Sequence, residues 1–325
     1  MRPRLSEVPL FFGPPEILSQ GERMRFGVTY GNHNSGVHIE DVLVYLRNAL
    51  LAAGEDAYIV PGLLRDGVNV LLEDFTSEQA WQITQLRKTV RARFVIIASE
   101  FTDGKRFNTH ITSGEGHYVD VEYWQKRFDA FLEVANAADA IWSLSEYSLP
   151  DYQALFPDKP VLAFPIGFDP LLPVACHPAA EEKDIDLLFT GSQTPHRKAL
   201  ISELGERFNV MLAPVTTITA SRIDLIRRAK ACLHVNLAPK ALYSSVMRHH
   251  FLVMNRAPVI SERAQTVGPL DDFITQFDDV EFTEGVTDYL RNCEWRGAGA
   301  AAHERYRQCR PIAGPMQEMI ARSFR

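Results

Sequence analysis

DLLFTGSQTPHRKALISEL (residues 186–204) contains the structural unit that recurs along this chain of 325 residues. A short apolar strand ends at Gly191, and a helix follows with Thr194 as its candidate N-cap and Pro195 at its first position. A strand that passes through a glycine turn into a helix is the unit from which doubly wound parallel sheets are built. The segment therefore predicts an α/β fold for the second half of the chain.

The same alternation of strand and helix extends in both directions from this segment. In the second half, strands are expected at 186–191, 209–214, 232–238, 258–261 and 279–283, and helices at 195–207, 220–230, 244–255 and 286–293, with one or two more after 299. In the first half, strands are expected at 26–30, 57–60, 68–72, 93–99, 140–144 and 160–165, and helices at 37–54, 77–89 (capped by Ser77) and 119–137.

A change of texture separates the two halves. Residues 167–184 carry three prolines and a charge cluster and have no apolar period, which is typical of a connector between domains. We therefore predict two Rossmann-like, doubly wound parallel-sheet domains, at residues 1–168 and 169–325. A length of about 150 residues per domain agrees with this division.

Composition excludes several classes of protein. The chain has 34 Lys and Arg against 41 Asp and Glu, a net charge of −7, which argues against a dedicated nucleic-acid binder. Four scattered cysteines without CxxC pairs indicate a reducing compartment and no zinc site. The chain has no apolar run long enough for a membrane span, and prolines interrupt the N-terminal apolar stretch, so no signal peptide is expected. These features predict a soluble, cytoplasmic protein.

The start of the helix at residue 195 is the first candidate binding site. Free backbone N–H groups and the positive end of the helix dipole would face the crevice at the carboxyl edge of the sheet. The dipole disfavours the two cations in the first turn, and a bound anion would relieve that conflict. The candidate residues are Gly191, Ser192, Thr194, Arg197 and Lys198. A well-capped helix with solvated basic side chains is the alternative interpretation.

A second group of polar residues lies in CLHVNLAPKALYSSVMRHHFLVMNRAPVISE (232–262). The strand at 258–261 delivers Glu262 to the same sheet edge, where a carboxylate can accept hydrogen bonds from sugar hydroxyls. The other candidates are Asn236 at the end of a strand, Lys240 in a loop, Ser244 or Ser245 as a helix cap, and Arg248 one turn inside that helix. An ordinary strand–helix–strand packing unit is the alternative here.

Residues 184–262 resemble the nucleotide-binding half of GT-B glycosyltransferases. The resemblance is carried by the glycine turn, the basic helix start, and RHHFLVMNRAPVISE (248–262), which is similar to a segment of a bacterial, CgeB-like branch of family 1-type enzymes. Arg248 and Glu262 match its pattern. The resemblance implies two facing domains, with a nucleotide sugar on the C-terminal one, an acceptor mainly on the N-terminal one, and in many members a last helix that crosses back.

The resemblance also implies roles for these residues. Arg248, Lys240, Arg197 and Lys198 would stabilise the negative charge on the departing diphosphate, with no metal and no cofactor. The helix starts at Thr194 and Ser244 would assist them, and Glu262 would hold donor hydroxyls. The partners would be a nucleotide sugar and a glycan, lipid or protein acceptor, without nucleic acid.

Two loops of the first half are candidates for the acceptor side. GNHNSGVHIE (31–40) follows the first strand, where a Rossmann-like sheet presents a ligand loop, and His33 or His38 is a candidate general base. Gly31, Asn34 and Gly36 would permit or make contacts with the ligand. The long polar loop at 100–117 adds Glu100, Arg106, Asn108 and His110. Solvated histidines in a polar loop are the alternative interpretation.

Two other functions stay open. A nucleotide-sugar epimerase also uses two facing Rossmann-like domains but needs no acceptor. A degenerate GT-B protein would bind or scaffold without turnover, and Ser245 and Phe251, at positions often acidic in the superfamily, favour it. No metal site is expected, because the adjacent His249 and His250 do not share a helix face and the acidic pair at 184–186 opens a strand at its amino edge. The sequence leaves the oligomeric state, the donor base and the donor sugar open.

Overall fold

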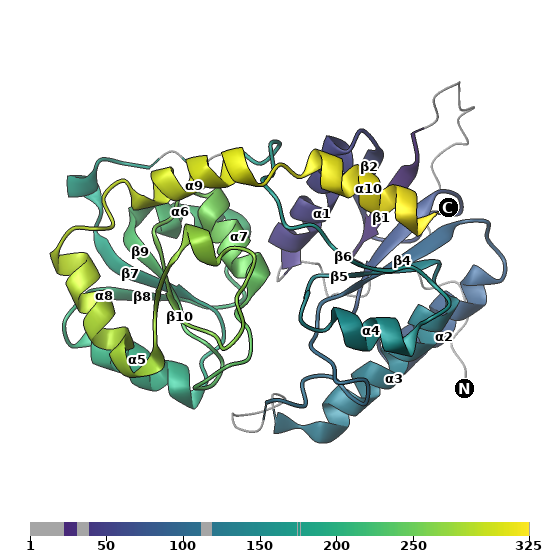
Figure 1. The fold of residues 1–325 in the computed structure, drawn as a ribbon, viewed down its shortest axis with the longest axis horizontal. Helices are drawn as coiled ribbons and strands as arrows, with labels where there is room; N and C mark the ends of the chain where they lie inside the picture. The colour runs from purple at the N-terminus through teal and green to yellow at the C-terminus, as the bar shows by residue number, and fades with distance from the viewer. Residues whose placement is uncertain (1–22, 31–38, 112–118, 174, 176, 325) are drawn as a thin grey trace.

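A computed structural model describes residues 23–30, 39–111, 119–173, 175 and 177–324, which form two α/β lobes (Figure 1). The first lobe has a parallel six-stranded sheet in the order β2-β1-β3-β4-β5-β6. Its strands are β1 (Arg25–Thr29), β2 (Asp56–Val60), β3 (Val68–Leu72), β4 (Arg93–Ala98), β5 (Ala140–Ser143) and β6 (Val161–Ala163). Its helices are α1 (Glu40–Ala52), α2 (Ser77–Arg87), α3 (Val121–Ala137) and α4 (Leu149–Leu155).

The second lobe has a parallel five-stranded sheet in the order β11-β10-β9-β7-β8. Its strands are β7 (Ile185–Thr190), β8 (Val210–Ala213), β9 (Ala229–His234), β10 (Val259–Glu262) and β11 (Thr275–Phe277). Its helices are α5 (Pro195–Gly205), α6 (Thr219–Arg228), α7 (Val246–Met254), α8 (Phe282–Arg291) and α9 (Ala298–Cys309), with the 3-10 turns η4 (Ala180–Glu182), η5 (Asp271–Phe273) and η6 (Asp279–Glu281). The predicted fold class is confirmed.

Each sheet has a hydrophobic core on both faces, as a parallel sheet covered by helices requires. Alternate residues of β4 divide between two cores: Val95 and Ile97 pack with α1, whereas Phe94 and Ile96 pack with α3. The apolar run at 93–99 is continuous for this reason.

The strand order places one crevice in each lobe. In the second sheet the chain adds β8 on one side of β7 and then β9 on the other, so the order reverses between β7 and β9. In the first sheet the reversal lies between β1 and β3. Ligands of doubly wound sheets bind outside the carboxyl ends of the strands at such a reversal. The carboxyl ends of β7 and β9 in the second lobe, and of β1 and β3 in the first, therefore flank these crevices.

The last described helix, α10 (Ala313–Ser323), lies on the first lobe rather than the second (Figure 1). Three residues of α10 and the residue before it belong to the hydrophobic core of the first lobe: Met316, Met319, Ile320 and Ile312. The indole Nε1 of Trp142 in β5 donates a hydrogen bond to Oγ of Ser323 at 2.8 Å. The C-terminal helix thus completes the core of the first lobe.

Two segments cross between the lobes next to each other. Phe168 N donates to the carbonyl of Arg310 at 2.6 Å. The hydroxyl of Tyr45 in α1 accepts from Gly167 N at 2.8 Å, and the ring of His250 in α7 lies 4.0 Å from that of Tyr45 between centroids. The domain boundary predicted at residues 168 and 169 falls at this crossing and stays a prediction.

The prediction of a strand at 279–283 is wrong. Residues Asp279–Glu281 form η6, helix α8 begins at Phe282, and the edge strand is Thr275–Phe277 instead. Phe282, Val286 and Tyr289 are all buried, at the i, i+4, i+7 spacing of one helix face. That helical period determines the structure, although Val280 and Phe282 alternate with charged residues as in a strand.

Smaller corrections concern the ends of elements. Helix α2 is capped by Thr76 rather than Ser77, because the Thr76 hydroxyl and the Gln79 side chain form a reciprocal capping box. Strand β9 spans Ala229–His234 rather than 232–238, because its pairing with β7 begins at Ala229 and α6 ends at Arg228. Helix α7 begins at Val246, so Ser245 rather than Ser244 occupies its N-cap position, without a capping hydrogen bond from its side chain.

Candidate functional site

The guanidinium of Arg248 lies at the reversal point of the second sheet. Gly191, directly after β7, has φ of +135°, a backbone conformation that favours glycine. A Cβ at this position would lie 3.0 Å from Nη2 of Arg248. Arg248 is the third residue of α7, so its side chain extends from the start of that helix to the turn after β7. The missing side chain at Gly191 makes room for it.

Arg197 is buried and holds the backbone of neighbouring loops. Its Nε donates to the carbonyls of Val235 and Asn236 at 2.9 and 3.2 Å, and Nη1 donates to the carbonyl and hydroxyl oxygens of Ser192 at 3.0 and 3.2 Å. Thr194 caps α5 and donates its hydroxyl hydrogen to the carbonyl of Leu237 at 2.8 Å. These contacts fix the loop after β7 against the loop after β9.

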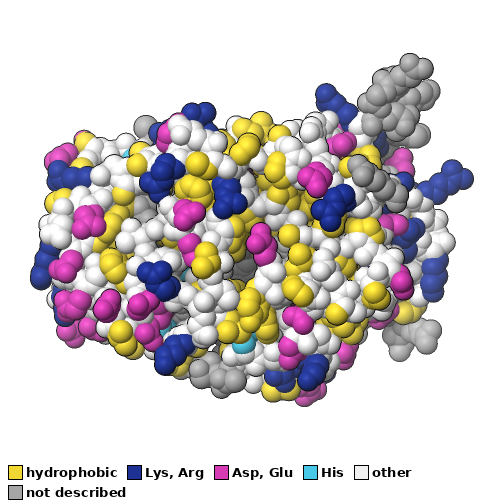
Figure 2. Space-filling view, viewed as in Figure 1, with side chains coloured by type: hydrophobic (Ala, Val, Ile, Leu, Met, Phe, Trp, Pro, Cys, Tyr) yellow, Lys and Arg dark blue, Asp and Glu magenta, His cyan; other side chains and the backbone are white. Residues whose placement is uncertain are grey.

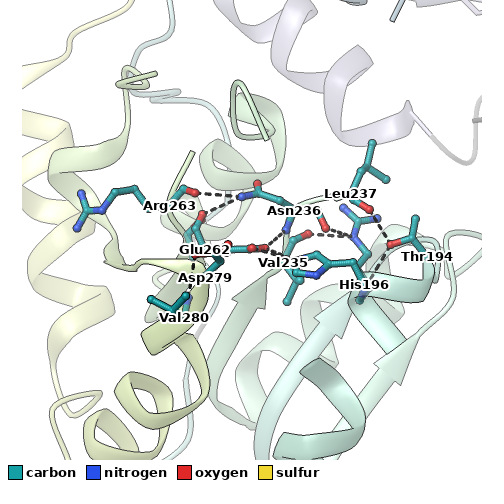
Figure 3. Close-up of polar contacts among 11 residues, drawn as sticks. Thr194, His196, Val235, Asn236, Leu237, Glu262, Arg263, Asp279 and Val280 are labelled. Atoms are coloured by element: carbon teal, nitrogen blue, oxygen red, sulfur yellow. Dashed lines mark hydrogen bonds and ion pairs between the residues drawn. The ribbon is translucent and has the colours of Figure 1, made fainter. Parts of the chain in front are cut away.

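Glu262 ends β10 and is fully buried, with its carboxylate already bonded (Figure 3). Nε2 of His196 lies 2.9 and 3.0 Å from its two oxygens, and Asn236 N donates to Oε2 at 2.8 Å. His196 is the second residue of α5, so this contact crosses above the end of β9. Figure 3 shows the ring of His196 and the backbone amide of Asn236 meeting the Glu262 carboxylate at the carboxyl edge of the sheet.

Three buried polar atoms near the start of α7 have no hydrogen-bond partner within the described residues. They are Oγ of Ser244, Nε2 of His234 and Nε2 of His249. The rings of the two histidines lie 4.5 Å apart between centroids. Burial lowers the pKa of His249 to about 3 and the pKa of His234 well below its usual value, so both rings are neutral near pH 7. Buried polar atoms are normally bonded, so these three are positions at which a ligand or a water can form a hydrogen bond.

The residues that follow β10 hold the loop between β9 and α7 in place by hydrogen bonds. Backbone amides of Gln265 and Thr266 donate to the carbonyls of Ala241 and Leu242, both at 2.9 Å. Lys240 is exposed at the tip of this loop with φ of +53°. The anchored loop therefore presents Lys240 and Ser244 from a defined backbone.

Carboxylates gather around Arg127 at the carboxyl edge of the first sheet. Glu73 follows β3 and Glu100 follows β4, and Arg127 of α3 forms ion pairs with both and with Asp74. Burial raises the pKa of Glu73 to about 7, which the charge of Arg127 only partly offsets. Glu100 is a quarter exposed and accepts a hydrogen bond from Asn108 at 2.8 Å.

Aromatic rings join the two lobes beside this carboxylate group. Tyr243, from the loop before α7, lies 5.8 Å from the ring of Phe101, 5.3 Å from His110 and 6.2 Å from Tyr147, measured between centroids. Burial raises the pKa of Tyr243 and lowers that of His110 to about 4, so both side chains are neutral near pH 7. The loop before α7 is therefore in contact with the loop after β4 and with Tyr147 of the first lobe.

The remaining predicted residues fall in three groups. His33, His38, Gly31, Asn34 and Gly36 lie outside the described residues. Lys198 is exposed on α5, and Ser245 is exposed before α7. Arg106 is half-buried in the loop after β4, with its Nε lacking a hydrogen-bond partner in the described part of the chain.

The structure brings in residues that sequence patterns miss. His196, Glu73 and Arg127 each gain significance from a partner distant in sequence, and only the position of Glu73 directly after an apolar strand gave a signal. Among the described residues, no cluster of three His, Cys, Asp or Glu side chains forms a metal site. In the same part of the chain, no helix is both long and apolar enough to cross a membrane.

Charge is distributed unevenly over the second lobe. Figure 2 shows acidic side chains gathered at the lower left of the view, over the end of that lobe that carries α5 and α8. This end lies away from the first lobe.

Comparison with known proteins gives evidence for the fold. No protein-family model matches the chain, and no curated protein matches it significantly. Among solved structures, BGT of phage T4 in complex with its UDP-glucose substrate aligns with a TM-score of 0.56 at 11% identity, covering 92% of this chain and 99% of that one.

Two further structures are similar. TarM of S. aureus aligns with a TM-score of 0.52 at 11% identity, covering 80% of this chain but 55% of TarM, so this chain spans about half of that protein. An E. coli structure described as trehalose-6-phosphate bound with UDP-2-fluoro glucose aligns with a TM-score of 0.50 at 13% identity, covering 86% of this chain and 77% of that one.

Together the two parallel sheets and these alignments define the fold as the GT-B type. The chain is structurally similar to glycosyltransferases that use nucleotide sugars.

Proposed function

We propose that this chain is a glycosyltransferase that binds a nucleoside-diphosphate sugar at the carboxyl edge of the second sheet. The observation that carries the proposal is the position of Arg248 over Gly191, beside the unpartnered polar atoms of Ser244, His234 and His249. A cation and unsatisfied polar groups at the start of a helix, at the reversal point of the sheet, are suited to a diphosphate.

The proposed reaction moves the sugar to an acceptor hydroxyl. The bond between the anomeric carbon and the diphosphate oxygen breaks, the diphosphate leaves with the electron pair, and the acceptor oxygen forms the new bond. Arg248 and the N-terminal N–H groups of α5 and α7 stabilise the charge that develops on the diphosphate. Lys240, exposed on the adjacent loop, adds a second positive charge. Arg197 is assigned to loop structure because its Nε and Nη1 bind carbonyls.

The acceptor is proposed to bind between the lobes, at the carboxyl edge of the first sheet. Glu100 is partly exposed there and is held by Arg127 and Asn108, which fixes its orientation toward an acceptor hydroxyl. A carboxylate in this position can accept the hydroxyl proton as the new bond forms. His33 and His38 stay as alternative proton acceptors from the loop after β1.

Nucleotide binding is the first test. The purified protein is titrated with UDP, GDP, ADP, CDP and dTDP by thermal shift and calorimetry, with EDTA and with magnesium. A ligand at a hundred times its Kd stabilises the protein by about 2.7 kcal/mol, which is readily detected. We expect one nucleotide to bind without a metal requirement.

Variants identify the site. Arg248→Ala should weaken binding of that nucleotide by about 10- to 100-fold, because a hydrogen bond to a charged group contributes about 1.5–3 kcal/mol. Arg291→Ala, which removes an exposed cation from the end of α8, is the matched control and should leave Kd unchanged. The proposal fails if no nucleotide binds, or if Arg248→Ala binds as tightly as the unmodified protein.

Turnover is tested with nucleotide sugars that carry the base identified by binding. The nucleoside diphosphate should be released as the sugar is transferred to water or to an added acceptor. The rate of this release should fall in Glu100→Gln, while the nucleotide Kd of the variant stays constant. Conversion of the donor sugar without diphosphate release would indicate an epimerase instead. Binding with no turnover on any donor would indicate a binding protein.

A further inference from the structure

The carboxylate of Glu262 is unavailable to a ligand in this structure. Its side chain has no exposed surface, and its oxygens already accept hydrogen bonds from His196 and Asn236. A ligand hydroxyl would have to displace the imidazole and leave a buried charge with less compensation, which is costly. The contact with donor hydroxyls that the sequence assigned to Glu262 therefore needs another residue.

The partly exposed side chain of His196 lies against the buried carboxylate of Glu262. Its side chain is 15% exposed, and the hydrogen bonds that it makes among the described residues run through Nε2 to Glu262. The carboxylate accepts a hydrogen bond from Nε2, which fixes the orientation of the ring. Nδ1 is then the ring nitrogen that a ligand hydroxyl can reach.

His196 also lies close to the proposed diphosphate site. It is the second residue of α5, the helix that follows the Gly191 turn, and Arg248 lies against that turn. In a nucleoside diphosphate the ribose is bonded directly to the phosphates. A diphosphate at Arg248 would therefore bring the ribose within reach of residues at the ends of β7, β9 and β10, where His196 meets Glu262 (Figure 3).

We propose that His196 recognises the ribose hydroxyls of the nucleotide through Nδ1, and that Glu262 is the residue that orients it. This inference rests on the proposed function. It assigns the ligand a ribonucleotide rather than a deoxyribonucleotide, because Nδ1 would form a hydrogen bond with a ribose hydroxyl that the deoxy form lacks. Glu262 acts on the ligand only through His196.

A thermodynamic cycle between the side chain and the ribose tests the proposal. Calorimetry compares each binding nucleoside diphosphate with its 2′-deoxy and 3′-deoxy forms, in the unmodified protein and in His196→Ala. The unmodified protein should bind one deoxy form about threefold to tenfold more weakly, the effect of one neutral hydrogen bond. In His196→Ala the ribo and deoxy forms should bind within about twofold of each other.

Two further variants separate recognition from folding. His196→Gln keeps an N–H group that can donate to Glu262 and should fold even where His196→Ala does not, and it should reduce the ribose preference. Glu262→Gln should reduce the same preference, because the imidazole loses its carboxylate partner. Ser202→Ala, at an exposed position of α5 that has no part in the proposed site, is the control and should keep the full preference.

The outcomes distinguish this inference from the proposed function. An equal loss of affinity for ribo and deoxy forms in the His196 variants would mean a contact with phosphate and would overturn the inference alone. Equal affinity for both forms in the unmodified protein would also overturn it. Absence of any nucleotide binding in the unmodified protein would refute the proposed function, and the inference with it.

Discussion

Replacement of Gly191 by alanine tests whether the turn after β7 must stay free of a side chain. The backbone at Gly191 has φ of +135°, and forcing an L-residue into such a conformation costs about 1–3 kcal/mol. The new Cβ would also lie 3.0 Å from Nη2 and 3.4 Å from Cζ of Arg248, so the guanidinium has to move. We expect the free energy of unfolding to fall by about 1–3 kcal/mol, and Kd for the bound nucleotide to rise about tenfold.

Two other glycines separate these effects. Gly54 has φ of +94° with no atom within 4 Å of an added Cβ, so Gly54→Ala measures backbone strain without a clash. Gly205, in the last turn of α5, has equally open space and no positive φ, so Gly205→Ala should be neutral or more stable by up to about 1 kcal/mol. Neither control should change nucleotide affinity.

Urea unfolding and calorimetry of the three variants provide the measurements. Nucleotide binding by Gly191→Ala as tight as that of Gly54→Ala would show that the turn after β7 tolerates a side chain. Equal stability of Gly191→Ala and Gly205→Ala would show that φ at Gly191 and its contact with Arg248 are both without consequence.

Three further predictions concern the first lobe. Burial raises the pKa of Glu73 from 4.5 to about 7, so the stabilisation by its protonated form is lost as pH rises through that range. Glu73→Gln should therefore reduce the fall in unfolding free energy between pH 5 and 7 by about 2 kcal/mol. Urea titrations of the variant with an unchanged pH dependence would contradict this. Ser323→Ala leaves the buried indole N–H of Trp142 unbonded and should cost about 1–3 kcal/mol of unfolding free energy while nucleotide Kd stays constant, whereas a loss below about 0.5 kcal/mol would exclude this contact as a stabilising one. Tyr45→Phe removes the hydroxyl that accepts from Gly167 N and should destabilise the protein by a similar amount in the same assay; an unchanged midpoint would mean that water replaces it.

The sequence predicted the layered fold because that information is local. The apolar run at 93–99 and the strand–turn–helix unit at 186–204 each show their period within one window, and both elements form where expected. The prediction of a strand at 279–283 was wrong because the alternation of Val280 and Phe282 with charged residues is short. The helical spacing of buried residues is longer and continues through Val286 and Tyr289. The short edge strand at Thr275–Phe277 is stabilised by pairing with β10, which a single segment does not reveal.

The candidate site was less accessible to prediction, and the reason is distance along the chain. Arg248 and Gly191 could be nominated from helix and turn patterns, but their contact joins residues 57 positions apart. Glu262 was nominated from its place at the end of a strand. Only the fold reveals that its carboxylate is hydrogen-bonded to His196, 66 residues away. The environment of a side chain depends on the elements that pack against it, so its role is decided after the sheet has formed.

The position of α10 has a consequence for biosynthesis. The core of the first lobe includes Ile312 and Met316, whereas the last strand of its sheet ends at Ala163. A ribosome that adds about 5–20 residues per second needs roughly 8–30 s to synthesise the residues between these points. During that interval the face of the first sheet that α10 covers stays open to solvent and to other nascent chains. The first lobe, although synthesised early, is completed after the second.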